Sequence, residues 1–261
     1  MRAYLADLLR SHELLYVLAW RDIKIKYKQS IMGYLWALMM PMIIVLAGVL
    51  VRFAFARFTG TGVDRTEVAD VAVKAVAWAF FVSALRFGTT SLIGNANLVT
   101  KIAFPKAVFP MAAVLSALFD LLIAGATVLV FLLILGVRFT PQALWTLPLC
   151  AVLVLLVFGI TGLLSVANLF FRDVKYLVEV IVTFAIFFTP VFYEASAFGR
   201  WQHLIMLNPV APVLESLAAV TVGGNAPPFS WVAYSALLGL VLTILTVYTF
   251  AVLEPQFAEN I

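Results

Sequence analysis

The feature that most constrains this fold is a long charge-free segment that directly follows a basic one. Arg21, Lys24, Lys26 and Lys28 lie close together, and residues 31–51 then contain no charged side chain. A hydrocarbon core about 30 Å thick requires about 20 predominantly apolar residues to cross it as a helix. Lys and Arg beside a span remain on the cytoplasmic side. We therefore expect a first transmembrane helix whose N-terminal side lies inside the cell.

The composition indicates an integral membrane protein. Of the 261 residues, 64% are hydrophobic and 11% are charged, whereas soluble domains carry about 25% charged residues. The first apolar run is too long, and begins too late, for a cleavable signal. The net charge of +4 reflects topology rather than nucleic-acid binding, because the basic residues flank the spans. Cys150 is single and His12 and His203 are isolated, so we expect neither an intramolecular disulfide nor a metal site.

The expected fold is all-α and integral to the membrane, with one permease domain over residues 1–261 and both termini cytoplasmic. Residues 1–30 are expected to form an amphipathic interfacial helix that acts as a gate. Residues 191–227 are apolar but interrupted by proline, and each half is too short to span, so a re-entrant helical hairpin at the outer face is expected. The six expected transmembrane helices cover about 31–55, 71–93, 107–135, 144–168, 176–190 and 229–252.

Besides Arg52 and Lys74 near span ends, three charged residues fall within the expected spans. A charge at membrane depth costs roughly 2.5–3.5 kcal/mol on insertion scales and is therefore a functional hypothesis. Arg86 and Glu179 lie at nearly the same depth from the cytoplasmic side, whereas Asp120 lies deeper. We expect an Arg86–Glu179 pair rather than an Arg86–Asp120 pair. The pair either serves transport or only holds two spans together, and a proton relay is a weaker alternative.

The basic segment has a polar and an apolar face at helical spacing. Arg21, Lys24 and Lys28 gather on the polar face, while Lys26 falls on the apolar face. These cations either anchor the helix to anionic lipid or recruit the anionic headgroup of a substrate. The second interpretation makes Arg21, Lys24 and Lys28 a headgroup site at the inner leaflet.

Aromatic residues gather at span ends and within several spans. Their rings can lie against the apolar faces of sugars, and Tyr and Trp add a polar group. The alternative for each residue is an interfacial belt or packing against lipid. The residues expected to line a glycan path are Tyr34, Trp36, Phe80, Phe81, Phe187, Phe188 and Tyr193.

Four stretches, in order along nearly the whole chain, carry a family resemblance. They are WRDIKIKYKQSIMGYLWALMMP, NLVTKIAFPKAVFP, NLFFRDVKYLVEVIVTFAIFFTPVFY, and LNPVAPVLES with the closing LEPQFAENI. As an ordered set they resemble the permease subunits of type-2 ABC exporters that move lipid-linked polysaccharides such as O-antigen, capsule or teichoic acid. The resemblance implies a channel-forming subunit in the bacterial cytoplasmic (inner) membrane.

The resemblance also implies the partners. They are a second copy of the chain, two copies of a separate ATPase subunit, and a glycan linked to a lipid diphosphate. The chain contains no G-x-x-x-x-G-K-[ST] phosphate loop, so ATP and Mg would be used by the partner. We expect this chain to bind no cofactor, to have no catalytic residues and to be a transporter subunit rather than an enzyme.

Two cytoplasmic segments are expected to contact the ATPase, and one outer turn to close the path. By resemblance, residues 94–106 form the coupling helix; the alternative is an ordinary interfacial loop. The Asn208–Pro209 turn is the expected outer gate. Arg172 and Asp173 form a second expected contact or, alternatively, a capped turn between helices. The coupling residues expected in the first segment are Asn97, Leu98, Lys101, Ile102, Phe104 and Pro105.

Other functions fit the residues less well. A type-2 exporter of a small drug or lipid is the nearest alternative. A membrane enzyme acting on a lipid-linked sugar, with Glu194 and His203 at the outer face, is a rival of another class. A structural scaffold would not explain charged residues at membrane depth.

Overall fold

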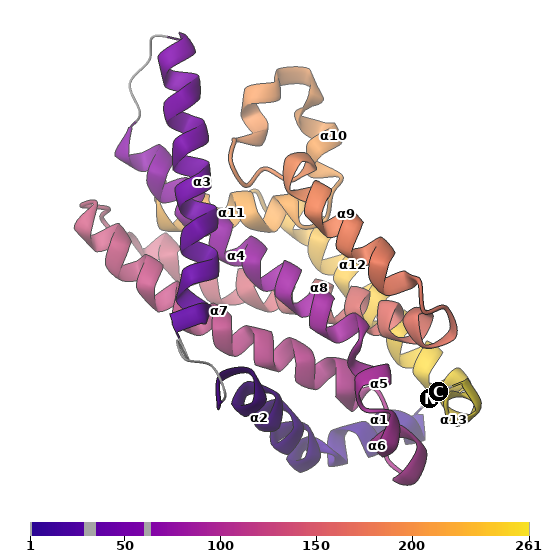
Figure 1. Ribbon diagram of the computed structural model, residues 1–261. Coiled ribbons are helices and arrows are strands. Elements are labelled where there is room, and N and C mark those ends of the chain that lie inside the picture. Colours follow the sequence, from indigo (N-terminus) through magenta and orange to yellow (C-terminus); the bar gives the residue numbers. More distant parts are fainter. Residues whose placement is uncertain (1, 29–34, 60–63, 261) are drawn as a thin grey trace.

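The computed structural model describes residues 2–28, 35–59 and 64–260, and these residues form helices without any strand (Figure 1). Four helical stretches of this described part are long and apolar enough to cross a membrane. They contain α4 (Arg65–Thr89), α7 (Val108–Ile134), α8 (Thr146–Phe170) with the preceding η1 (Pro141–Trp145), and α12 (Phe229–Leu253). The expected all-α fold is confirmed.

Two further helices correspond to the first and fifth expected spans. The first, α3 (Leu35–Thr59), has 25 residues, which is about 37 Å at 1.5 Å per residue. The other, α9 (Val174–Phe188), has 15 residues and is about 22 Å long, shorter than the ~30 Å hydrocarbon core. The chain leaves α9 at Thr189 in extended backbone. The fifth expected span therefore does not reach the length of a complete span on its own.

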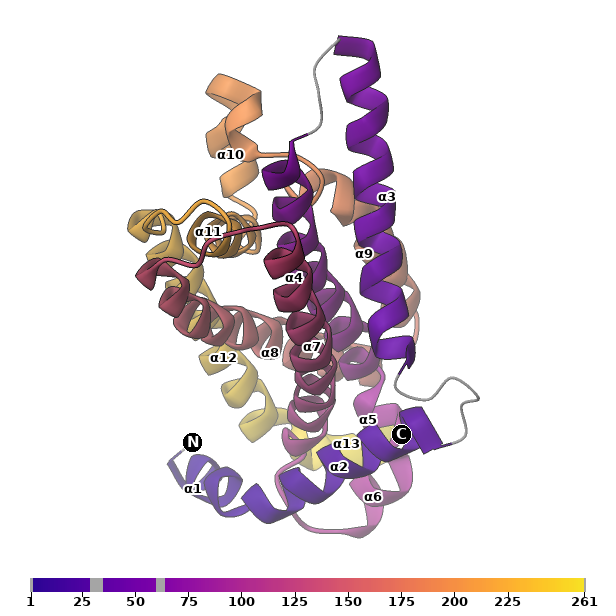
Figure 2. The same cartoon turned by 90° about the vertical axis from the view of Figure 1, so that its left-hand side faces the viewer.

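Helix α4 lies at the centre of the bundle, in contact with α3, α7, α8 and α11 (Ala211–Thr221) (Figure 2). It can be surrounded because its buried positions are mainly alanine: Ala69, Ala72, Ala75 and Ala84 have no exposed surface. Small side chains let helix backbones approach closely within a membrane. A Cβ added at Gly88 would lie 1.9 Å from Thr161 of α8, so this glycine sets the distance between α4 and α8.

Helices α8 and α12 pack face to face along much of their length. A Cβ on Gly162 would lie 2.2 Å from the Thr246 side chain, and one on Gly159 would lie 2.8 Å from the backbone nitrogen of Thr243. The close approach lets the Thr246 hydroxyl donate to the Gly159 carbonyl at 2.7 Å. Such interhelical hydrogen bonds stabilise helix pairs where no water competes.

The N-terminal segment is two helices rather than one. Helix α1 (Arg2–Arg10) ends where the Ser11 hydroxyl donates to the Asp7 carbonyl at 2.8 Å, and α2 (His12–Lys28) follows. A serine bonded back to its own helix competes with continued helix formation. The second expected span also begins earlier than 71, because the Asp64 carboxylate accepts the Arg65 N–H at 2.6 Å and caps α4.

The two ends of the bundle differ. One end carries α1, α2, α5 (Ser91–Gly94), α6 (Ala96–Lys101), η3 (Glu254–Gln256) and α13 (Phe257–Asn260) (Figures 1 and 2). At the other end, η2 (Ala195–Trp201) and α10 (Gln202–Met206) project beyond α11. Helix α11 itself is largely buried against α4 and α8. The segment expected to form a re-entrant hairpin thus contains one projecting part and one buried helix.

Candidate functional site

The end that carries α1, α2, α6 and α13 has a hydrophobic core of its own. Buried residues of α2, α5, α6, α7, α8, α12 and α13 meet there, among them Leu92, Phe109, Phe250 and Phe257. The Phe257 ring lies 5.6 Å from that of Phe250, at a T-shaped angle. Because α13 packs into this core, the C-terminal segment helps to hold the short helices in place.

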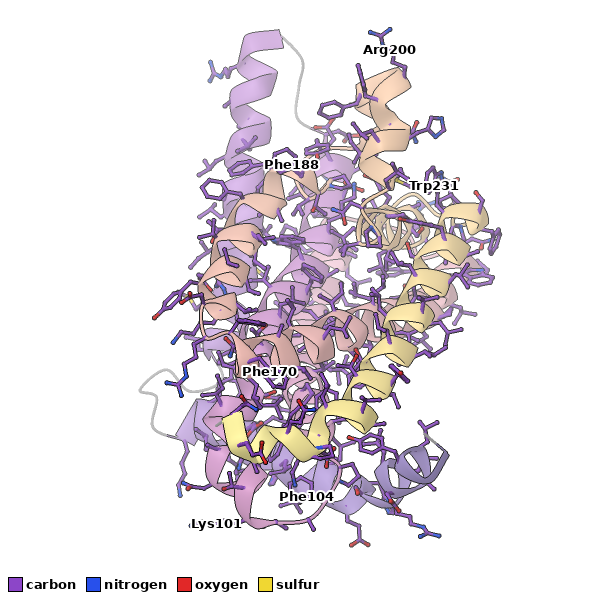
Figure 3. All side chains as sticks on the ribbon, turned by 90° about the vertical axis from the view of Figure 1, so that its right-hand side faces the viewer. Lys101, Phe104, Phe170, Phe188, Arg200 and Trp231 are labelled. Carbon is purple, nitrogen blue, oxygen red and sulfur yellow. The ribbon has the colours of Figure 1, made fainter. Side chains whose placement is uncertain are left out.

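The expected coupling segment divides into an anchored side and an exposed side. Phe104 packs inward, with its ring 5.4 Å from that of Phe109, and Leu98 is also partly buried in the same core. Pro105 is buried. Ile102 is 50% exposed, and Asn97 and Lys101 are exposed beside it. Figure 3 shows Lys101 at the extreme of this end.

This division corrects one part of the expectation. Leu98, Ile102 and Phe104 are the apolar side chains among the residues expected to contact the ATPase. In the structure Leu98 and Phe104 anchor the segment to the chain's own core, and Ile102 is the apolar residue that faces outward. The reason is the bend after α6, where Ile102 leaves helical geometry for extended backbone.

A polar contact that the sequence analysis did not identify fixes the end of this segment. The Tyr4 hydroxyl donates to Glu254 Oε2 at 2.7 Å, and the Lys106 backbone N–H donates to the same oxygen at 2.9 Å. Burial, together with the Glu254 carboxylate, raises the pKa of the Tyr4 phenol. One carboxylate thus joins α1, η3 and the segment before α7. Its partners are 148 and 250 positions away in the sequence, so local pattern carries no signal of it.

The second expected contact, the turn between α8 and α9, is also exposed. Arg172 and Asp173 face outward, and the neighbouring Phe171 is 71% exposed. The turn is fixed from behind, because the Asn168 side chain accepts the Lys175 N–H at 3.1 Å. The geometry fits both expectations for this turn, a partner contact and a capped connection.

The basic residues of α2 have different surroundings. Arg21 forms an ion pair with Asp22 at 2.7 Å and donates to Asn95 at 2.8 Å, so it ties α2 to the junction of α5 and α6. Lys24 is exposed and lies 5.4 Å from the centre of the Trp20 ring. Lys28 is exposed at the end of the helix. Of the three residues expected at the headgroup site, Lys24 and Lys28 face outward.

Asp120, in the middle of α7, is bound from α2. Lys26 forms an ion pair with it, and the Tyr27 hydroxyl donates to it. This contact explains why Lys26 lies on the apolar face of its helix. It also means that Asp120 serves the contact between α2 and α7.

Arg86 and Glu179 form an ion pair between α4 and α9, with Arg86 Nη2 2.6 Å from Glu179 Oε1. Their side chains remain 44% and 54% exposed. They border a pocket of about 300 Å³ that also includes Thr89, Lys175 and Tyr176. The pair is therefore accessible from outside the bundle.

The expected path-lining aromatics fall into three groups. Phe80 and Phe81 are 2% and 8% exposed within the core, so we remove both from the expected lining. Phe187 and Phe188 are 65% and 74% exposed on α9 (Figure 3), and Tyr193 is partly buried, with its hydroxyl donating to the Phe187 carbonyl at 3.1 Å. Tyr34 and the side chain of Trp36 lie outside the described residues.

The expected outer turn links α9 to α12. The Asn208 side chain donates to the Thr189 hydroxyl at 2.9 Å, and the Pro209 carbonyl accepts from Ser235 at 2.8 Å. The turn is therefore attached to both helices.

The two residues considered for an enzyme have different neighbours. Glu194 accepts a hydrogen bond from Ser196, and the His203 ring lies beside the Trp231 ring. Among the described residues, no group of three or more His, Cys, Asp or Glu could hold a metal ion.

Comparison with known proteins identifies the family. The pattern of ABC-2 type transporters matches residues 13–222, from the first turn of α2 to the end of α11. The chain belongs to the ABC-2 type transporter family.

Alignments with known relatives cover nearly the whole permease. It is 28% identical to the O-antigen export system permease protein RfbA of Klebsiella pneumoniae over 253 residues, covering 95% of this chain and 94% of the relative. It is 26% identical to the RfbA protein of Myxococcus xanthus over 266 residues, covering 98% of each. The chain is a multi-pass membrane subunit of a type-2 ABC exporter.

The permease also contains a buried ionic cluster that the sequence analysis missed. Lys74 of α4 has no exposed surface, and its Nζ lies 2.8 Å from Asp70 and 3.1 Å from Glu215 of α11. Glu215 also accepts the Ala195 N–H at 3.0 Å. Lys74 falls at the start of the expected span 71–93, and the sequence analysis gave it no partner. The signal that could have placed it is the i, i+4 spacing of Asp70 and Lys74 on one helix face.

Proposed function

We propose that this permease moves a lipid-linked polysaccharide of the O-antigen, capsule or teichoic acid type across the bacterial cytoplasmic membrane. The substrate class is supported by the relatives, which are O-antigen export permeases aligned over almost their full length. The chain would be a single permease domain with six spans, both termini in the cytoplasm and the segment 191–227 at the outer face.

The observation that carries the proposal is the exposed rim formed by α6 and the residue that follows it. Asn97, Lys101 and Ile102 face outward, while Phe104 and Pro105 fix the segment to the bundle core. A segment that transmits force needs both an exposed docking surface and a rigid attachment. We propose that this rim and the turn at Arg172 and Asp173 dock on a separate ATPase, which uses ATP and Mg. The permease itself would then bind no cofactor and catalyse no reaction.

A second copy of the chain would complete the transport path. The outward face of α9 carries Leu177, Ile181, Phe184 and Phe188, which are 58–74% exposed and recur at spacings of four, three and four. This is the periodicity of one helix face. We propose that this face and α3 meet their copies in a homodimer, with Phe187, Phe188 and Tyr193 along the glycan path. Tyr34 and Trp36 remain proposed lining residues at the start of the first span.

Headgroup recruitment would begin at α2. Lys24 and Lys28 are the outward cations of that helix, and Arg21 sets its position against α5 and α6. At the opposite end, the Asn208–Pro209 turn would follow movements of α9 and α12, because hydrogen bonds join it to both. We propose that this turn closes the outer end of the path.

The test is co-expression of the permease with the ATPase encoded beside it, followed by purification and measurement of ATPase activity and glycan export. We expect a complex of two copies of each subunit. Ile102→Asn should lower permease-dependent ATPase activity and export about tenfold or more, as for a buried residue at the centre of an interface. Leu204→Asn is the matched control, since Leu204 is 62% exposed on α10 at the other end. Equal activity of the Ile102 variant and the parent would refute the coupling assignment. Export of a small amphiphile instead of glycan would favour the drug or lipid exporter.

A further inference from the structure

A pocket at the ends of α4 and α9 has the chemistry of an anion site. Arg86 comes from the last turn of α4, and Lys175 and Tyr176 from the first turn of α9. The pocket volume, about 300 Å³, is at the lower limit of the roughly 300–1,000 Å³ seen for small-ligand sites. A headgroup fits such a space, whereas a complete glycolipid does not.

The charges in the pocket favour an anion. Arg86 and Lys175 are two cations, and among the described residues that border the pocket Glu179 is the single acidic one. A guanidinium has five N–H donors in a planar fork, which matches a phosphate group as well as a carboxylate. Glu179 Oε1 lies 2.6 Å from Arg86 Nη2, and the Glu179 side chain is more than half exposed. A carboxylate in this position occupies the place that a phosphate oxygen would take.

The surroundings point to a lipid as the source of that anion. Tyr176 lines the pocket and is 63% exposed, and Val180, one helical turn further along the same side of α9, is 57% exposed. On the other side, Phe87 follows Arg86, and Lys26 of α2 lies 5.0 Å from the centre of its ring. The pocket therefore has the basic helix α2 on the side of Phe87 and exposed side chains of α9 on the side of Tyr176.

We propose that this pocket binds the phosphate or diphosphate group of a lipid phosphate ester, with Arg86 and Lys175 as the binding cations and Glu179 as the internal occupant that the ligand displaces. The inference rests on the proposed function for the identity of the lipid and names the site that would hold its headgroup. Displacement frees Arg86 from α9. Headgroup binding would therefore change the contact between α4 and α9.

The experiment measures equilibrium binding to the full-length permease in nanodiscs, without the ATPase, so that no nucleotide site competes. The probes are farnesyl diphosphate, farnesol and inorganic pyrophosphate. We expect farnesyl diphosphate to bind more tightly than either of the other probes. Arg86→Gln should weaken it about tenfold, the loss expected for a charge-assisted hydrogen bond. Lys175→Gln should weaken it several-fold, and Glu179→Gln should strengthen it, because the internal competitor is gone.

Arg138→Gln is the control, since Arg138 is an exposed cation after α7, outside the pocket. Thermal unfolding of each variant reports its fold. If Arg86→Gln does not fold, Lys175→Gln carries the test, because the side chain of Lys175 is exposed. Weaker binding in Glu179→Gln would show a purely structural pair and overturn the proposal. Equally tight binding of pyrophosphate would indicate a free phosphate ligand, and equally tight binding of farnesol an apolar site; each overturns it. Failure of the permease to associate with an ATPase would refute the proposed function while leaving this binding pattern intact.

Discussion

At the scale of single residues, the charges inside the bundle hold helices together across long distances in the sequence. Lys26 binds Asp120 between α2 and α7, and Lys74 binds Asp70 and Glu215 between α4 and α11. A buried ion pair adds little net stability over an apolar pair. Removal of one partner, however, leaves an uncompensated buried charge. Each cluster should therefore tolerate replacement as a whole better than replacement of one member.

Replacement of Lys74 tests this at the most buried charge. Lys74→Met leaves Asp70 and Glu215 without their common cation and should lower the free energy of unfolding by about 3–5 kcal/mol. Arg65→Met, on the same helix but exposed, should change it by less than about 0.5 kcal/mol. Thermal unfolding in detergent measures both. The double variant Lys74→Met/Glu215→Gln should recover part of the loss, and a double variant no more stable than Lys74→Met would contradict the pairing.

At the scale of helices, the distance between partners is set by glycine where backbones meet. A Cβ at Gly159 would lie 2.7 Å from Leu242 Cβ and 2.8 Å from the Thr243 nitrogen, whereas one at Gly125 of α7 has nothing within 4 Å. Both glycines lie inside helices. The same substitution should therefore have opposite effects at the two sites.

We expect Gly159→Ala to destabilise the permease by about 1–3 kcal/mol, because overpacking forces α8 and α12 apart. Gly125→Ala should stabilise it by about 0.5–1 kcal/mol, because alanine restricts the unfolded chain and meets no neighbour. The measurement is the unfolding temperature of both variants in one detergent. The close packing of α8 and α12 would be contradicted by a Gly159→Ala variant as stable as the parent.

At the scale of the whole molecule, the bundle has two different ends, and its function depends on which side of the membrane each end faces. Asn97 and Glu259 are exposed at the end with α6 and α13, and Arg200 is exposed at the other (Figure 3). The basic segment of α2 lies with the first two, and basic residues beside spans stay cytoplasmic. The exposed rim of α6 should therefore face the cytoplasm.

Cysteine labelling measures this orientation directly. Cys150 is the single native cysteine, so a Cys150→Ala background accepts one new cysteine at a time. In intact spheroplasts, a membrane-impermeant maleimide should label Arg200→Cys and should label Asn97→Cys and Glu259→Cys only after permeabilisation. Labelling of Glu259→Cys from outside would contradict the prediction. It would mean that the termini, or the whole bundle, face the opposite side of the membrane.

Much of this arrangement follows from local sequence. The apolar runs near 107–135 and 229–252 became α7 and α12 with ends shifted by a residue or so, because a continuous apolar segment is helical wherever water is absent. The depth argument placed Arg86 and Glu179 close to one another, since equal distance from one membrane surface is readable along the chain. The exposed side of α6 lies within the expected coupling segment. The direction in which it faces could not be predicted, because the bend at Ile102 depends on the core beneath it.

The sequence alone determined that the chain is helical, where its long apolar helices lie and which family it resembles, since these depend on composition and order along the chain. The tertiary structure decided which polar groups meet: Tyr4 with Glu254, Lys26 with Asp120, and Lys74 with Glu215, at separations of 250, 94 and 141 positions. It also decided that Phe80 and Phe81 are buried while Phe187 and Phe188 are exposed. An apolar helix has no polar face to show which side will be covered, so burial is settled only when neighbouring helices pack against it.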